Sequence, residues 1–519
     1  MKSLRFAALL LFVFTANTSI IYAQLTSGQI DSLTKLTLKT FDVPGIAVAI
    51  VKDGKIIHSQ GYGVRSLNTK QPVDENTLFG IASNSKAFTA AALGMLVDEN
   101  KIKWDDKVTD YIPEFRLYNP YVTEEFTIRD LLTHRSGLGL GAGDLMFWPD
   151  SSDFTKKDMI HNLRYLKQVS SFRTKYDYDN NLYVVAGEVL TRASGMSWEN
   201  FIQKRILDPL GMSATAPSYK LLKDKSNVID PHAPVDGFVK VIRRDWNETA
   251  NAAGGIYSNL TDMCKWVIMQ INHGKFGDNL NKKLFTNEVH EDMWAPQTII
   301  PVRSINAYNT HFASYGLGWF LSDEKGYKVA THTGGLAGIV TQVTIIPELK
   351  LGIIVFTNQQ VGAAFSAITN TIKDSYYGMK GIDWVKRNHD RVVAGQTNAK
   401  NITDKIWKDI EAQQKISSSP DINNFTGTYT DKWFGDVVIS QKNGRLWFDS
   451  KRSFLLTGEM IYYKGNTFIV KWNDRSMDAD AFVKFELDND GKGSSIKMNP
   501  ISPLTDFSFD FQDLDLKRK

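Results

Sequence analysis

The strand-forming segments of residues 25–377 lie at the two ends of that stretch, and a helix-rich middle separates them. Near the start, two apolar runs at 46–51 and 56–59 flank Asp53-Gly54, a dipeptide that favours a β-hairpin. Strand-like runs return only late, at 317–321, 327–331, 340–346 and 351–357. The pattern predicts an α/β (α+β) fold, in which an antiparallel sheet is built from both ends and a helical subdomain, from about 86 to 269, is inserted between them.

A second, smaller unit follows. Residues 379–420 are polar and helical in pattern and end in the linker-like run Ser417-Ser418-Ser419-Pro420. Short strand-like segments come next, and the hairpin dipeptide Asn443-Gly444 separates two of them. They lie at 426–430, 436–440, 445–449, 467–472 and 482–486. We expect one domain over 24–378, a helical and polar linker over 379–420, and a small all-β, barrel-like domain over 421–519.

The first residues have the pattern of a secretory signal peptide. Lys2 and Arg5 precede an apolar run at 6–14, and Ile21-Tyr22-Ala23 fits a signal-peptidase site before Gln24. The run is too short to span a bilayer, and the alternative is a buried N-terminal helix. We therefore expect residues 1–23 to be removed, leaving an exported bacterial protein, periplasmic or secreted, without a transmembrane anchor.

Charge and cysteine content exclude several classes of partner and cofactor. The formal net charge is +4 and falls to about +2 when Lys2 and Arg5 are removed, which argues against nucleic acid as a partner. Cys264 is the only cysteine, so neither an intrachain disulfide nor a cysteine metal site can form. There is no H-E-x-x-H pair, and Asp488-Asn489-Asp490-Gly491 is interpreted as a hairpin turn rather than a calcium loop. We expect no metal and no organic cofactor.

Ser83-Asn84-Ser85-Lys86 is the first candidate for chemistry. Residues three apart share one face of a helix, so the spacing holds a hydroxyl beside an amine. Lys86 can activate Ser83 as a nucleophile without a histidine, provided that the lysine pKa is lowered. Ser32, Ser322 and Ser494 also have a lysine three residues later, so the spacing alone is weak. Ser83 differs from them because it joins a strand-like approach at 78–82 to an alanine-rich helix at 87–97.

Two Tyr-x-Asn triplets could supply further groups. We prefer Tyr178-Asp179-Asn180, because in Tyr257-Ser258-Asn259 the serine is expected to cap the following helix. A tyrosine near a lysine ammonium can have a lowered pKa and act as a base or proton relay. Asn180 can donate to a substrate carbonyl and hold Lys86 in place. The charge of Asp179 would oppose a lowered tyrosine pKa unless the side chain points away.

His332-Thr333-Gly334-Gly335 follows one of the late strands. Its glycines would let a substrate backbone lie close to that strand. The alternative is a plain glycine turn at a strand end.

These motifs, in this order, resemble the signature of penicillin-recognising serine hydrolases, and especially the class C branch of β-lactamases, DD-carboxypeptidases, D-aminopeptidases and esterases. Three further stretches are similar to that branch: Leu131–Leu138, Gly254–Ser258 and His332–Gly338. The resemblance covers about 25–377, and the C-terminal unit resembles a small β domain often appended to such hydrolases in bacteria.

The resemblance implies a role for each motif residue. Ser83 would be the acylated nucleophile, Lys86 its general base and Tyr178 the proton relay to the leaving group. Asn180 would orient the substrate amide, and the backbone N–H groups of Ser83 and Gly335 would form the oxyanion hole. His332, Thr333 and Gly334 would lie beside Gly335 on the strand that aligns the substrate.

Two departures from the family pattern bear on the substrate. His332 stands where β-lactamases of this branch usually have a lysine that holds the β-lactam carboxylate, and Asp179 stands where serine or alanine is common. We therefore expect D-amino-acid peptides or amides, peptidoglycan-derived ones included, or small esters. The alternatives are a β-lactamase and, from another class, a non-catalytic cell-wall-binding or sensor protein. The oligomeric state stays open.

Overall fold

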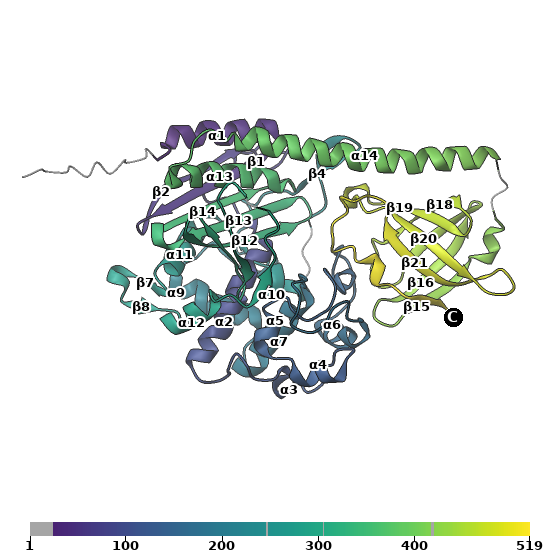
Figure 1. Ribbon diagram of the computed structural model, residues 1–519, viewed down its shortest axis with the longest axis horizontal. Helices are drawn as coiled ribbons and strands as arrows, with labels where there is room; N and C mark the ends of the chain where they lie inside the picture. Colours follow the sequence, from purple (N-terminus) through teal and green to yellow (C-terminus); the bar gives the residue numbers. More distant parts are fainter. Residues whose placement is uncertain (1–23, 245–247, 305, 417–419) are drawn as a thin grey trace, which may run out of the picture.

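The computed structural model describes residues 24–244, 248–304, 306–416 and 420–519. The predicted signal peptide (1–23) and part of the predicted linker (417–419) lie outside the described residues. Figure 1 shows an α/β domain beside a β-barrel, with one long helix, α14 (Trp384–Ile416), running along both. None of the helices in the described ranges combines the length and the apolar character needed to cross a bilayer.

Within the described residues, the α/β domain contains one antiparallel sheet of eight strands. Their order is β2 (Lys55–Gly63), β1 (Gly45–Lys52), β14 (Leu351–Thr357), β13 (Ile339–Ile346), β12 (Tyr327–Leu336), β11 (Phe320–Glu324), β10 (Ala313–Tyr315) and β9 (Thr298–Ile300). The early hairpin joins the late strands through β1, whose Ile46 pairs with Thr357 of β14. The prediction of a sheet built from both ends is confirmed.

Helices cover both faces of this sheet, as Figure 1 shows. Alternate residues of β1 belong to different cores: Ile46 and Val48 pack on the side of α1 (Ser27–Thr40) and α13 (Gly362–Tyr377), whereas Ala47 and Ala49 pack in the core that holds α2 (Ser85–Asp98) and α11 (Leu260–Ile271). A strand buried on both faces needs a nearly continuous apolar sequence, which β1 has.

The inserted subdomain is mainly helical, as expected. Its helices are α3 (Val108–Tyr111), α4 (Pro120–Glu125), α5 (Ile128–Leu131), α6 (Lys156–Asn162), α7 (Asn181–Ser194), α8 (Trp198–Phe201), α9 (Asp208–Leu210) and α10 (Asn251–Gly254); α12 (Asn287–Met293) follows α11. Three two-stranded sheets accompany these helices in the described residues: β3 (Phe79–Gly80) with β6 (Tyr257–Ser258), β4 (His232–Val235) with β5 (Phe238–Val241), and β7 (Lys275–Phe276) with β8 (Lys282–Lys283).

The C-terminal unit is a closed barrel, which confirms the predicted all-β class. Its strands are β15 (Gly427–Asp431), β16 (Gly435–Lys442), β17 (Arg445–Ser450), β18 (Thr457–Lys464), β19 (Thr467–Trp472), β20 (Ala481–Leu487), β21 (Gly493–Pro500) and β22 (Leu516–Arg518). Three of them, β18, β21 and β22, were missing from the prediction, because polar residues interrupt their apolar pattern.

Three local predictions need correction. The strand expected at 317–321 begins only at Phe320, because Gly318 takes a left-handed turn (φ +79°). His332 to Gly335 lie inside β12 rather than beyond it. Asn259, not Ser258, caps the next helix, since its side chain accepts from the backbone N–H of Asp262.

Helix α14 packs against both domains. Its first turns bury Trp384 and Val385 against the helices of the α/β domain. Its later turns bury Ile406 and Ile410 against Ile469 on the outside of the barrel. One helix therefore fixes both domains relative to each other.

Candidate active site

Ser83 lies on a tight 3-10 turn (Ala82–Asn84) at the start of α2. Ala82 has a φ of +49°, a conformation that costs a non-glycine residue free energy and that the surrounding contacts must hold in place. The turn is tied to the sheet, because Asn84 Nδ2 donates to Thr341 Oγ1 at 2.9 Å and Thr341 Oγ1 donates to Ile81 O at 2.9 Å. These bonds hold the Ser83 hydroxyl in one place.

Gly334 allows β12 to pass directly behind this turn. A Cβ at this position would lie 2.3 Å from Ile81 O and 2.9 Å from Ala82 Cβ, both too close. The next residue, Gly335, faces the other side of the strand, where an added Cβ would meet nothing within 4 Å, and it lines the cavity. The first glycine is needed for packing, and the second leaves room beside the strand.

Lys86 is completely buried one turn after Ser83. Its Nζ donates to Ser83 Oγ at 3.0 Å, to Asn180 Oδ1 at 2.7 Å and to Ala253 O at 2.9 Å. Burial lowers the pKa of Lys86 to about 7, although nearby carboxylates act in the opposite direction. The lowered lysine pKa that the sequence reasoning required is therefore present.

Tyr178 contacts both Ser83 and Lys86: its side chain hydrogen-bonds with Ser83, and Lys86 Nζ is 4.7 Å from the centre of its ring. The expectation that the lysine lowers the pKa of Tyr178 is wrong. Burial raises that pKa well above 10, and a hydrogen bond with Ser83 opposes the shift only in part. The phenol therefore keeps its proton at neutral pH and can donate it.

Asn180 connects Lys86 to a carboxyl group that sequence reasoning missed. Its Nδ2 donates to Asp144 Oδ2 at 2.8 Å, while its Oδ1 accepts from Lys86. Asp144 is buried, and burial raises its pKa well above the usual range. An amide nitrogen carries two hydrogens, so one N–H of Asn180 remains for a substrate.

Asp179 points away from Tyr178. Its carboxylate accepts from the backbone N–H of Leu182 at 3.3 Å, in the first turn of α7. Its own backbone N–H donates to His134 Nδ1 at 3.1 Å. Asp179 thus accepts from the first turn of α7, while His134 holds the Tyr178–Asn180 segment in place.

His332 lines the cavity, but both of its ring nitrogens are engaged. Nδ1 lies 2.6 Å from Thr333 O, and since a carbonyl only accepts, Nδ1 carries the proton. Nε2 then accepts from the Tyr315 hydroxyl at 2.8 Å. Burial lowers the pKa of His332 to about 3, so the ring is neutral at pH 7 and cannot serve as a cation for a substrate carboxylate.

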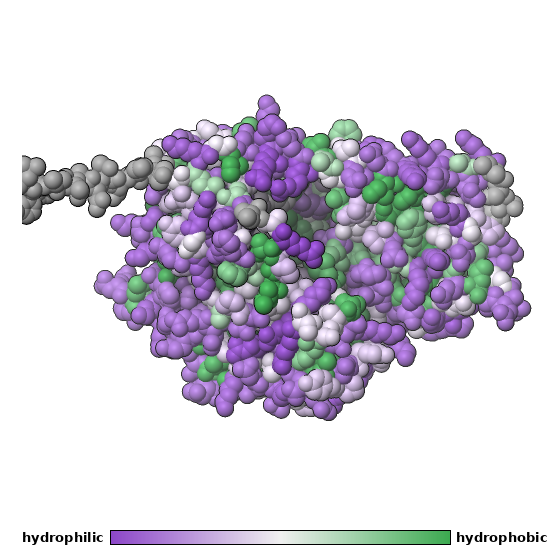
Figure 2. Space-filling view, in the orientation of Figure 1, coloured by the Kyte–Doolittle hydropathy of each residue, from purple (hydrophilic) through white to green (hydrophobic). Residues whose placement is uncertain are grey.

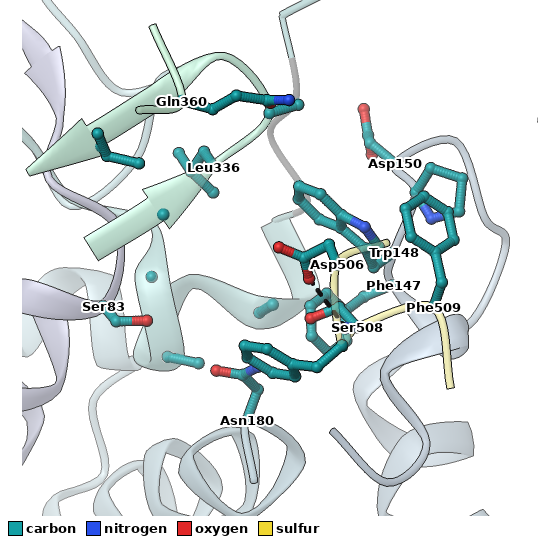
Figure 3. A pocket seen from close by; sticks show the side chains of 18 of the residues that line it. Ser83, Phe147, Trp148, Asp150, Asn180, Leu336, Gln360, Asp506, Ser508 and Phe509 are labelled. Atoms are coloured by element: carbon teal, nitrogen blue, oxygen red, sulfur yellow. Dashed lines mark hydrogen bonds between the residues drawn. The ribbon is translucent and has the colours of Figure 1, made fainter. Parts of the chain in front are cut away.

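These residues open into a cavity of about 580 Å³ between the two domains. Figure 2 shows the surface hollowed there. Figure 3 shows Ser83 and Asn180 on one side and Asp506, Ser508 and Phe509 on the other. Of the predicted site residues, Ser83, Tyr178, Asn180, His332, Thr333 and Gly335 line the cavity, while Lys86 and Gly334 lie directly behind it.

Sequence reasoning missed the barrel side of the cavity completely. That wall comes from two connections of the barrel, between β19 and β20 and between β21 and β22; its residues are Asp474, Ser476, Met477, Asp478, Leu504, Asp506, Phe507, Ser508 and Phe509. Three phenylalanines alternate with polar residues at 506–511, a pattern that predicts a strand, yet the structure has no strand there and three of these residues line the cavity instead of pairing in the barrel: Phe507, Ser508 and Phe509.

No group of three or more metal-ligating side chains lies close together in the described ranges. The site chemistry described above rests on Ser83, Lys86 and Tyr178.

Two family models match the chain. The Beta-lactamase model matches residues 30–376, and a domain of unknown function, DUF3471, matches residues 411–518. The sequence is 28% identical to unguisins hydrolase ungD of Aspergillus violaceofuscus over 438 residues, which are 79% of this chain and 76% of the relative. It is 24% identical to protein flp of Staphylococcus aureus over 335 residues, 64% of this chain and 62% of flp.

The fold is similar to that of the octameric penicillin-binding protein homologue from Pyrococcus abyssi. The TM-score is 0.61, with 21% sequence identity, over 93% of this chain and 99% of the other. At this identity the likeness concerns the fold alone, including the arrangement of sheet and helices that holds Ser83.

Proposed function

Because this chain belongs to the beta-lactamase family of serine hydrolases, whose model matches residues 30–376, we propose that it hydrolyses small amides or esters through an acyl-enzyme on Ser83. The observation that carries this proposal is the buried Lys86, whose Nζ lies 3.0 Å from Ser83 Oγ and whose pKa is lowered to about 7. A lysine with such a lowered pKa can lose its proton near neutral pH and then accept one from Ser83.

In the first half of the reaction, neutral Lys86 takes the proton of Ser83 while Oγ attacks the substrate carbonyl carbon. The backbone N–H groups of Ser83 and Gly335 receive the oxyanion. The tetrahedral intermediate then expels its amine or alcohol, which takes the proton of the Tyr178 hydroxyl, and the Lys86 ammonium reprotonates Tyr178. In the second half, water attacks the acyl-enzyme with the same groups in the reverse order.

The two pKa shifts favour Lys86 over Tyr178 as the base. A group is an efficient base when its pKa is near the working pH, and this holds for Lys86. The pKa of Tyr178 is raised, so its phenolate would be rare at pH 7. Tyr178 suits the role of acid.

The charges around the cavity bear on the substrate. Among the described residues that line it, Arg243 is the one cation, and it is paired with Asp150 at 3.3 Å. The barrel side adds Asp474, Asp478 and Asp506. With His332 neutral as well, the site suits neutral or amine-bearing substrates better than carboxylates. We therefore place D-amino-acid amides, N-terminal D-peptides and small esters ahead of DD-carboxypeptidase substrates and β-lactams.

Intact-mass measurement after reaction with a fluorophosphonate tests the proposal. We expect one adduct on the wild type and none on Ser83→Ala, with Ser494→Ala as a control that keeps reactivity because Ser494 lies at the start of β21, where its hydroxyl donates to Glu486 O at 3.1 Å. Absence of a Ser83-dependent adduct would overturn the acyl-enzyme proposal and leave a binding or sensor role.

Rates with nitrocefin, D-Ala-D-Ala peptides, D-amino-acid amides and p-nitrophenyl esters rank the substrate classes. We expect the amides or esters to react fastest. Nitrocefin turnover above all others would contradict the argument from His332 and promote the β-lactamase alternative.

We also propose that the protein is exported. The support is the charged, apolar and small-residue pattern of residues 1–23. N-terminal sequencing of the protein from a bacterial expression host should find Gln24 first, and an intact Met1 in a cytoplasmic fraction would contradict export.

A further inference from the structure

We propose that the barrel contributes to the active site through residues 502–511, hereafter the barrel loop: Ser508 and Asp510 position Asn180 by way of Asp144, and Phe507 limits the size of the substrate. The barrel loop connects β21 to β22, and the proposal rests on the function proposed above. It assigns to the DUF3471 region a part in the reaction itself.

A continuous series of hydrogen bonds runs from the barrel to the lysine. Ser508 Oγ donates to Asp144 Oδ2 at 2.8 Å, Asn180 Nδ2 donates to the same oxygen at 2.8 Å, and Lys86 Nζ donates to Asn180 Oδ1 at 2.7 Å. All three bonds are buried. Ser508 and Lys86 lie in different domains, so docking of the barrel completes this series.

The donor and acceptor groups of this series fix which way round the Asn180 amide lies. An ammonium can only donate, so Asn180 must present Oδ1 to Lys86 and its Nδ2 to the other side. A carboxylate on that other side satisfies Nδ2, and Asp144 supplies it. If Asp144 moved, the amide could rotate and turn its NH2 group toward the Lys86 ammonium, so that Lys86 would lose one of its three acceptors and keep only Ser83 Oγ and Ala253 O.

Asp510 holds the segment that carries Asp144. Its Oδ2 accepts from Gly143 N at 2.7 Å and its Oδ1 accepts from Leu145 N at 3.0 Å, the two backbone groups on either side of Asp144. The Asp510 side chain is fully buried. Asp144 is therefore held by the barrel loop both at its carboxyl group and at its backbone.

Phe507 forms the part of the wall next to the reacting groups. Its ring meets Tyr178 edge-on, with 5.8 Å between ring centres. The backbone of the barrel loop lies close to Gly141, where an added Cβ would be 2.7 Å from Phe507 O. Phe507 stays 40% exposed and Leu504 52% exposed, and both line the cavity rather than the barrel core. An exposed apolar wall opposite Ser83 would contact the substrate.

The positioning role is tested with Ser508→Ala and Ser508→Thr in the full-length protein. We expect the kcat of Ser508→Ala to fall roughly tenfold per active site, the effect of one lost buried hydrogen bond, with KM changed less. Ser508→Thr, which keeps a hydroxyl, should recover most of the loss. Active sites are counted by fluorophosphonate labelling, so a smaller folded fraction cannot imitate the effect. Ser494→Ala removes a hydroxyl elsewhere on the barrel and serves as the matched control.

A kcat per labelled site for Ser508→Ala equal to that of the wild type would overturn the positioning role. So would an equal loss in Ser508→Ala and Ser508→Thr. Asp510→Asn gives a second measure, because it weakens the hold on Gly143 and Leu145 without touching Ser508. It should lower kcat in the same direction.

The size limit is tested with Phe507→Ala and two p-nitrophenyl esters, acetate and octanoate. We expect the ratio of kcat/KM for octanoate over acetate to rise about tenfold, a typical effect of reshaping an apolar pocket. Phe312→Ala removes an aromatic ring that is 79% exposed in the other domain and should leave the ratio unchanged. An unchanged ratio in Phe507→Ala would overturn the size limit.

These results separate the two proposals. If the wild type forms the Ser83 adduct but the barrel-loop variants behave like the wild type, only the further inference fails. If no adduct forms on Ser83, the proposed function fails first.

Discussion

The two sides of the cavity are built in different ways. On the α/β side, Ser83 lies on a 3-10 turn and Lys86 on the helix that follows it, and Gly334 packs behind the turn. On the barrel side, Phe507 and Ser508 sit on a connection between two strands, and their positions depend on how two domains dock. The first side holds the reacting groups, and the second shapes the space around them.

The Ser83 turn and the Asn180 amide are held in place by contacts of different origin. The Ser83 turn is fixed by bonds within its own domain, such as Asn84 to Thr341. The Asn180 amide is fixed from outside, by Asp144 and the barrel loop. We therefore expect substitutions on the α/β side to abolish the chemistry, and substitutions on the barrel side to change its rate and selectivity.

Replacement of Lys86 should have the largest effect. Lys86→Met keeps the length of the side chain but removes the base and leaves Asn180 Oδ1 and Ala253 O without a donor. We expect kcat/KM to fall by about 10⁴, the upper end of the range for general acid–base groups. Steady-state kinetics with a p-nitrophenyl ester measures it. A loss below tenfold would mean that another group takes the proton from Ser83.

Tyr178→Phe should have the second-largest effect. The substitution keeps the ring that meets Phe507 and removes only the proton donor, so we expect a loss of roughly 10²–10⁴ in kcat. The loss should be greater for substrates with poor leaving groups, such as amides, than for p-nitrophenyl esters. Equal losses for both would point to a different donor, with Tyr257→Phe as the variant to compare.

The pair Gly334→Ala and Gly335→Ala tests how closely β12 packs against the Ser83 turn. A Cβ at Gly334 would press on Ile81 and Ala82, and we expect a loss of about 1–3 kcal/mol in the free energy of unfolding. A Cβ at Gly335 meets open space, so that variant should unfold like the wild type. Urea unfolding of both variants measures the difference, and equal stabilities would contradict the close approach of β12.

The pH dependence of kcat/KM tests whether Asp144, which the barrel loop holds, acts on Lys86. If neutral Lys86 is the base, kcat/KM should rise with pH through a limb near 7, where the lysine loses its proton. The carboxylate of Asp144 raises the pKa of Lys86, against the larger effect of burial. Removing that charge in Asp144→Asn should move the limb to lower pH. A limb at the same pH in both proteins would show that Asp144 does not act on Lys86.

Arg452→Ala should have the smallest effect. Arg452 joins the two domains away from the cavity, with Nε 2.6 Å from Asp153 Oδ1 and Nη2 3.0 Å from Asp158 Oδ2. Exposed pairs of this kind contribute about 0–1 kcal/mol, so we expect a small fall in Tm and unchanged kcat/KM. A large loss of activity would mean that the whole domain interface, rather than the barrel loop, governs the site.

The sequence allowed the α/β side to be predicted because its signals are local. A serine and a lysine three residues apart at a helix start, or Leu351–Thr357 as a continuous apolar run, can be recognised without knowing the tertiary structure. Asp144 and Ser508 could not be found in this way, since 364 residues separate them and only domain docking brings them together. The direction of the Tyr178 pKa was also mispredicted, because loss of contact with water raises this pKa and the charge of Lys86 does not reverse the shift.

Helix α14 has a consequence for protein engineering. Its first turns are packed on one domain and its later turns on the other, so the helix sets both the distance and the rotation between them. One inserted residue advances a helix by about 1.5 Å and turns it by about 100°. An insertion near Gly395, where an added Cβ meets nothing, would be harmless to the helix itself but would swing the barrel away from Asp144. The length of α14 thus sets how the two domains are placed. Another barrel grafted onto this hydrolase would need the same number of helical residues before it, or a number that differs by whole turns.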